Sequence, residues 1–95
     1  MLEGLKLKDQ EYHPGEDYEF YGIRVSCTAT FASEFGESYM TLIKESLQMI
    51  SEKYPDRKWD YLQVFSYKDN EFYAISDCQK GDRDGIVVFM MPSDY

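Results

Sequence analysis

The chain has few of the residues that most often carry chemistry. Its 95 residues include one histidine, two cysteines, three prolines and six glycines. Cys27 and Cys78 are far apart, and no Cys-x-x-Cys pair or second Cys/His cluster accompanies them. This excludes the usual zinc-binding and thioredoxin-type spacings. We expect both thiols to be free and buried rather than joined in a disulfide.

Motifs for catalysis are also missing. The glycines never form the GxGxxG or GxxxxGK[ST] spacing of phosphate-binding loops, and no serine lies in a GxSxG nucleophile elbow. The only histidine, His13, precedes a Pro-Gly turn, and general-base catalysis would need a nucleophile and an orienting group beside it. We therefore expect no enzyme, no catalytic residue and no cofactor. The less favoured alternative is a small hydrolase or metal-dependent enzyme, which would lose activity on His13→Ala or on chelation.

The acidic loop near the C-terminus has a superficial likeness to a calcium-binding loop. It contains Asp77, Asp82 and Asp84. An EF-hand needs ligands at alternating positions, a central glycine and a terminal bidentate glutamate. In this loop Gly81 precedes the acidic pair and the closing glutamate is absent. We expect a solvated hairpin loop and no metal site.

Long hydrophobic runs are absent as well. The longest, residues 86–91, is far shorter than the roughly 20 residues that cross a bilayer. The N-terminus lacks the apolar region of a signal peptide. We expect a soluble, cytoplasmic protein.

The residues that are present predict one folded domain over 1–95. The chain is 43% hydrophobic and contains six Phe, nine Tyr and one Trp, which is the opposite of a disordered composition. Its length suits a single domain with one modest core.

Periodicity predicts the elements of that domain. Residues 18–31 alternate between apolar and polar types, which is typical of a half-buried strand. Residues 33–54 carry an apolar stripe at helical spacing, with Ser33 as the expected N-cap, Gly36 weakening only the first turn, and Pro55 ending the helix.

Three further strands are predicted after the helix. They cover 60–67, 71–77 and 85–91; the first two are joined by a tight hairpin in which Asp69-Asn70 accepts positive φ, and the last is an interior strand. Residues 1–17 form an N-terminal arm with a short edge strand at 5–8. The predicted fold is α+β, a single helix packed on a largely antiparallel sheet in the order β–α–β–β–β with an N-terminal arm.

The charge of the chain is strongly one-sided. Eighteen Asp and Glu oppose ten Lys and Arg, which gives a net charge of −8 and a pI near 4.5. Phosphate groups would repel such a protein, so direct binding to nucleic acid or to an anionic membrane is disfavoured. A basic protein is the favoured partner.

The acids gather with tyrosines in one segment. No Lys or Arg occurs between positions 9 and 21. The candidate partner-binding residues of this segment, with two acids of the later loop, are Asp9, Glu11, Tyr12, Glu16, Asp17, Tyr18, Glu19, Asp82 and Asp84. One interpretation is an ordinary solvating surface, since a net charge of magnitude about 2–8 is common. The other is an interaction surface, in which tyrosines supply anchors and carboxylates pair with arginine.

Two stretches carry a resemblance to known proteins. Tyr61-Leu62-Gln63-Val64-Phe65 and the ending Val87 to Tyr95 resemble a family of short, functionally uncharacterised bacterial proteins with a similar strand motif and an acidic-Tyr terminus. In size, acidity and lack of catalytic motifs the chain also resembles phage-encoded inhibitors of bacterial defence, including DNA-mimicking anti-CRISPR proteins. This second likeness is one of character and implies no particular site residue.

These observations give one leading hypothesis and one alternative. The leading hypothesis is a non-enzymatic, acidic protein-binding module that inhibits a basic partner, such as a nucleic-acid-binding protein or nuclease, by occupying its nucleic-acid-binding surface. The alternative is an accessory or regulatory subunit that uses an exposed sheet edge or the helix for homo- or hetero-oligomerisation, with residues 86–91 as the expected edge. A homodimer is one form that this alternative would take.

Overall fold

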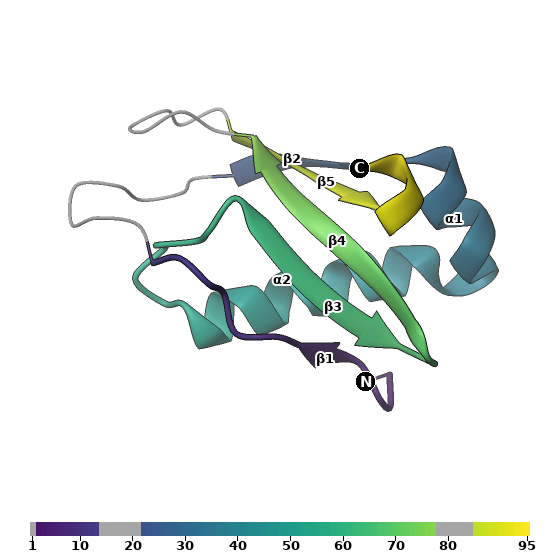
Figure 1. Ribbon diagram of the computed structural model, residues 1–95, viewed down its shortest axis with the longest axis horizontal. Coiled ribbons are helices and arrows are strands. Elements are labelled where there is room, and N and C mark those ends of the chain that lie inside the picture. Colours follow the sequence, from purple (N-terminus) through teal and green to yellow (C-terminus); the bar gives the residue numbers. More distant parts are fainter. Residues whose placement is uncertain (1, 14–21, 78–84) are drawn as a thin grey trace.

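The protein folds as a five-stranded sheet with helices on one face (Figure 1). A computed structural model describes residues 2–13, 22–77 and 85–95. Its elements, in chain order, are β1 (Lys6–Leu7), β2 (Gly22–Cys27), α1 (Ala29–Phe35), η1 (Gly36–Ser38), α2 (Tyr39–Lys53), β3 (Leu62–Tyr67), β4 (Asn70–Asp77), β5 (Gly85–Met90) and η2 (Pro92–Asp94). The predicted α+β class is confirmed.

The strands lie in the order β1-β3-β4-β5-β2. Three neighbouring pairs are antiparallel, and β2 runs parallel to β5. The expected short edge strand in the arm is confirmed as β1, and β5 is interior, as expected. Because β5 pairs with β4 on one side and β2 on the other, the idea that residues 86–91 offer an exposed edge is wrong.

The first helix begins earlier than the alternation predicts. β2 ends at Cys27, and residues 29–31, predicted as strand, lie in α1. Thr28, not Ser33, is the N-cap, and its hydroxyl accepts the Phe31 N–H at 3.2 Å. This cap satisfies a free amide of the first turn, so it outweighs the continued alternation.

The predicted single helix is divided at Gly36. This residue has φ +55°, ends α1, and is followed by one 3-10 turn before α2 begins. The expectation that it merely weakens a first turn is wrong, because such a φ interrupts the helix.

The predicted tight hairpin joins β3 to β4. Lys68 and Asp69 occupy its two central positions with φ of 48° and 63°. Positive φ at both central residues is the signature of a type I′ turn, which matches the twist of the flanking strands. The left-handed pair is thus one residue earlier than the predicted Asp69-Asn70.

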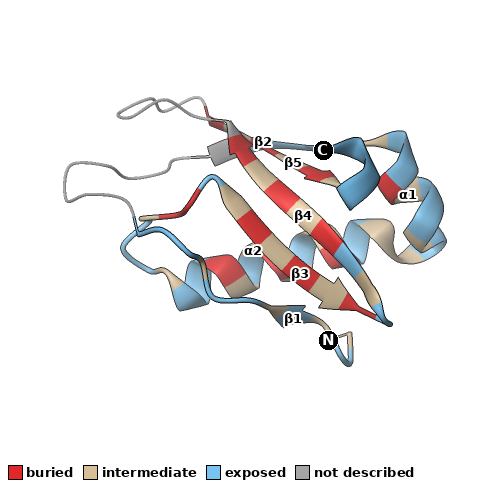
Figure 2. Ribbon diagram, viewed as in Figure 1, coloured by how far each residue is buried: buried red, intermediate tan, exposed pale blue. Residues whose placement is uncertain are grey.

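Alternate residues of the sheet face the helices and form the core (Figure 2). Phe31, Phe65, Phe72 and Phe89 are fully buried, and the rings of Phe65 and Phe72 stack with centroids 5.1 Å apart. Tertiary packing of this aromatic layer, more than helix propensity, holds α1 and α2 in place.

The opposite sheet face is covered by no α-helix among the described residues, and Figures 1 and 2 look onto it, with α2 behind the strands. We call it the open face. Along β3, β4 and β5 this face carries a patch of half-buried apolar residues, beside which lie Ser66 and the exposed Glu71. The patch consists of Leu62, Val64, Tyr73, Ile75, Ile86, Val88 and Met90.

Two further expectations meet the structure only in part. Cys27 is a free thiol, but it is half-buried rather than buried, and Cys78 lies outside the described residues. No helix in the described part of the chain has the length and apolarity needed to cross a membrane.

Candidate functional site

Three tyrosines meet on the open face. Tyr73 projects from β4, and the C-terminal Tyr95 packs against its ring edge-on, with centroids 5.7 Å apart. The hydroxyl of Tyr95 lies 3.1 Å from that of Tyr61. Tyr61 and Tyr95 are still 54% and 67% exposed, so the cluster presents aromatic surface to solvent.

The electrostatic surroundings of Tyr61 are negative. The hydrogen bond with Tyr95 raises the pKa of Tyr61, and the nearby charges of Asp60 and Glu11 raise it further. Each of these groups disfavours a phenolate. Tyr61 therefore presents a neutral hydroxyl beside two carboxylates.

Asp94 holds the C-terminal turn that carries Tyr95. Its carboxylate accepts the Thr28 hydroxyl at 2.7 Å and the Met91 N–H at 3.0 Å. These hydrogen bonds, with a smaller one from Thr30, lower the pKa of Asp94. Because Thr28 also caps α1, the position of Tyr95 is tied to the start of the helix.

A groove of about 270 Å³ lies beside the tyrosines, between the N-terminal arm and the open face. Its floor is apolar and is made by Leu62, Val64 and Tyr73. Its rim is polar and mostly acidic, and consists of Lys8, Asp9, Gln10, Glu11, Asp60 and Glu71. We call this site the acidic groove.

Two of the four acids on the rim are already paired. Glu71 accepts from the Lys8 ammonium, which raises the pKa of Lys8, and Asp9 pairs with Lys53. Glu11 and Asp60 form no ion pair with any described residue. The negative charge of the groove is therefore concentrated at the end near Tyr61.

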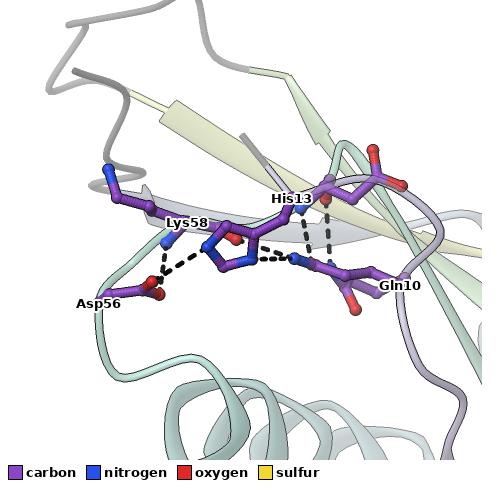
Figure 3. Close-up of polar contacts among 6 residues, drawn as sticks. Gln10, His13, Asp56 and Lys58 are labelled. Carbon is purple, nitrogen blue, oxygen red and sulfur yellow. Dashed lines mark hydrogen bonds and ion pairs between the residues drawn. The ribbon is translucent and has the colours of Figure 1, made fainter. Parts of the chain in front are cut away.

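The arm that forms one wall is anchored by the Gln10 amide (Figure 3). Its Oε1 accepts the Asp60 N–H and the Gln63 amide, both at 2.8 Å, and its Nε2 donates to the Lys58 carbonyl at 3.0 Å. The Gln10 N–H also donates to the Tyr54 hydroxyl at 3.0 Å. This set of bonds fixes the arm against the start of β3.

His13 continues the same network. One ring nitrogen lies 3.1 Å from Asp56 Oδ2 and the other 3.2 Å from Gln10 Nε2, as Figure 3 shows. With both nitrogens in contact with these groups, His13 fastens the arm to the corner after α2. Neither contact is with a serine, threonine or cysteine nucleophile.

The structure places three of the predicted partner-binding residues. Asp9 and Glu11 lie on the rim of the groove, and Tyr12, next along the arm, is 61% exposed. The others lie outside the described residues; they are Glu16, Asp17, Tyr18, Glu19, Asp82 and Asp84. The predicted calcium-like loop falls largely in the same undescribed segment.

Sequence reasoning missed Asp60, Tyr61, Tyr73 and Tyr95 as site residues. Their only local signal is the combination of an acid and a tyrosine at a strand or chain end, as in Asp60-Tyr61 and Asp94-Tyr95. Across the described ranges no group of three or more His, Cys, Asp or Glu side chains is arranged to hold a metal ion.

Comparison with known proteins returned no match to any family model, curated protein or solved structure.

Proposed function

We propose that the protein is a non-enzymatic binding module whose acidic, tyrosine-bearing surface docks on a basic protein and blocks that protein's access to nucleic acid. In this role it would act as an inhibitor of the DNA-mimic or anti-CRISPR type. The observation that supports this most directly is the acidic groove with exposed tyrosines at one end.

The chemistry of the groove suits a cationic protein surface. Tyrosines provide rigid contact area at a small cost in conformational entropy, and they are enriched at interfaces. Carboxylates accept bidentate hydrogen bonds from arginine as phosphates do. A net charge of −8 steers basic partners toward the protein over a long range and repels nucleic acid itself.

The test is capture followed by competition. The immobilised full chain is incubated with bacterial lysate at about 50 and about 200 mM salt, the range over which phosphate-type contacts weaken strongly. We expect a nucleic-acid-binding protein to be retained at the lower salt and to be released by added duplex DNA. Retention that DNA does not disturb would contradict competition for a nucleic-acid surface.

Two variants with the same net charge distinguish binding through a specific surface from a general effect of net charge. The first changes Asp9, Glu11, Glu16, Asp17 and Glu19 to their amides. The second does the same to five exposed acids elsewhere, Glu3, Glu34, Glu37, Glu52 and Asp69. We expect only the first to lose the captured partner; equal loss from both would leave only a general effect of charge.

The edge strand β2 favours a second candidate, an accessory subunit that oligomerises. Its side away from β5 pairs with no strand among the described residues, and Val25 is 44% exposed. Unpaired edges accept a further strand from another chain. Salt-insensitive self-association in light scattering, abolished by Val25→Lys, would support this candidate over the inhibitor.

A further inference from the structure

We propose that the acidic groove is a pocket for one arginine side chain of the partner, with the guanidinium on Asp60 and Glu11 and the aliphatic stem over Leu62 and Val64. This inference rests on the proposed function and specifies the group that the site recognises.

Asp60 provides the main observation. The residue is only 8% exposed, yet it lines the groove. Its backbone N–H and carbonyl are bonded to Gln10 and Gln63, but its carboxylate receives no hydrogen bond and no ion pair from the described residues. Because the rest of the residue is shielded from solvent, a cation that reaches this carboxylate through the groove is screened less by water than one at an exposed acid.

The charge distribution within the groove determines which end of it takes the cationic head of the ligand. Lys8 and its partner Glu71 occupy one end, and their pairing leaves no net charge there. Glu11 and Asp60 lie at the other end, near the Tyr61 hydroxyl. A cationic head is therefore drawn to the Tyr61 end.

The form of the groove favours arginine over lysine. A guanidinium offers five donors in a planar fork, which can serve two carboxylates at once, and it packs well against aromatic rings such as that of Tyr73. Its methylene stem matches the apolar floor. The volume of about 270 Å³ is just below the roughly 300–1,000 Å³ of small-molecule sites, which suits one side chain better than a cofactor.

The experiment is an NMR titration of the full, ¹⁵N-labelled chain with N-acetyl-arginine amide. N-acetyl-citrulline amide has nearly the same shape without the charge, and N-acetyl-lysine amide has the charge without the fork. We expect the arginine compound to shift the amide signals of Leu62, Val64 and Tyr73, with a dissociation constant of about a millimolar, the scale for so small a ligand. Equal binding of the citrulline or lysine compound would overturn the proposal.

Single substitutions identify the carboxylates. Asp60→Asn and Glu11→Gln should each weaken arginine binding about tenfold, because a charged hydrogen bond becomes a neutral one. Glu34→Gln, which removes the same charge from α1, should leave binding unchanged. Glu11 is on the exposed arm, so its variant stays informative even if Asp60→Asn disturbs folding. Unchanged binding in Glu11→Gln and in a folded Asp60→Asn would overturn the assignment.

The result is independent of the capture experiment. Arginine binding at the groove without a DNA-displaced partner would support the pocket and reject the inhibitor. A captured, DNA-displaced partner with no arginine binding at the groove would reject the pocket and keep the inhibitor.

Discussion

At the scale of single residues, the wall of the groove depends on one amide outside any regular element. Gln10 accepts from Asp60 and Gln63 and donates to Lys58, so its side chain replaces backbone pairing where the arm has left β1. Gln63 is 1% exposed, and its own Oε1 has no hydrogen-bond partner in the described part of the chain.

Gln10→Ala should therefore be costly. It would leave the Asp60 N–H without an acceptor, and the Gln63 Nε2 would keep only its longer hydrogen bond to the Asp60 carbonyl. Each buried group left unpaired costs about 1–3 kcal/mol. We expect the free energy of unfolding to fall by about 2–3 kcal/mol, measured by urea denaturation.

Gln48→Ala is the matched control. Gln48 is exposed on α2, and its amide donates to Glu52 at 3.2 Å and to no other described residue, so its loss should change stability by less than about 0.5 kcal/mol. Equal effects of the two substitutions would show that Gln10 does not hold the arm.

At the scale of elements, the break between α1 and α2 depends on the backbone of Gly36. Its φ of +55° and ψ of −132° are strained for any residue with a Cβ, while a Cβ built there meets nothing within 4 Å. Gly36→Ala should thus lower stability by about 1–3 kcal/mol through backbone strain alone. Thermal or urea unfolding measures this, and Glu37→Ala, the exposed neighbour, should stay within about 0.5 kcal/mol. A Gly36→Ala variant as stable as the wild type would mean that α1 and α2 are joined in a different backbone conformation.

The link between η2 and α1 should depend on pH. Hydrogen bonds from Thr28 and Met91 lower the pKa of Asp94 below its ordinary value of 3.8, so folding favours the carboxylate. The contribution to stability is then fully present above pH 3.8 and is lost as the pH falls through the lower folded-state pKa. We expect Asp94→Asn to lower the melting temperature at pH 7, and the gap to the wild type to narrow below about pH 4.

A Thr28→Ala background tests the cause of that gap. It removes the hydroxyl that donates to Asp94, so Asp94→Asn should have a smaller effect there than in the wild type. A gap that is constant between about pH 3 and 7 would contradict the link.

Much of the fold was predictable at this scale, because the alternation in residues 18–31, the apolar run of residues 86–91 and the helical stripe are local patterns. The start of α1 was not. Alternation continues through Ala29 and Phe31, while Phe31 and Phe35 also have helical spacing, and only the Thr28 cap decides between the two.

At the scale of the whole molecule, the site was predictable only where its acids lie close together in the sequence. Asp9 and Glu11 were found from composition. Asp60, Tyr73 and Tyr95 come together through the pairing of Val64 with Tyr73 and through the C-terminal turn, and neither is encoded in a local pattern. Residues that are far apart in the sequence carry no local sign that they meet in the fold.

The net charge of the whole molecule leads to a last prediction. Eighteen acids against ten bases make repulsion the dominant long-range interaction, whereas surface pairs such as Lys8–Glu71 contribute only about 0–1 kcal/mol each. Raising the salt from about 0.01 to about 0.15 M shortens the screening length from about 30 to about 8 Å and weakens that repulsion. We therefore expect the melting temperature to rise with salt, as measured by calorimetry.

The variant with Glu3, Glu34, Glu37, Glu52 and Asp69 changed to amides has less repulsion to screen, so its melting temperature should rise less. A wild type that loses stability as salt is added would show instead that its ion pairs outweigh the excess of negative charge.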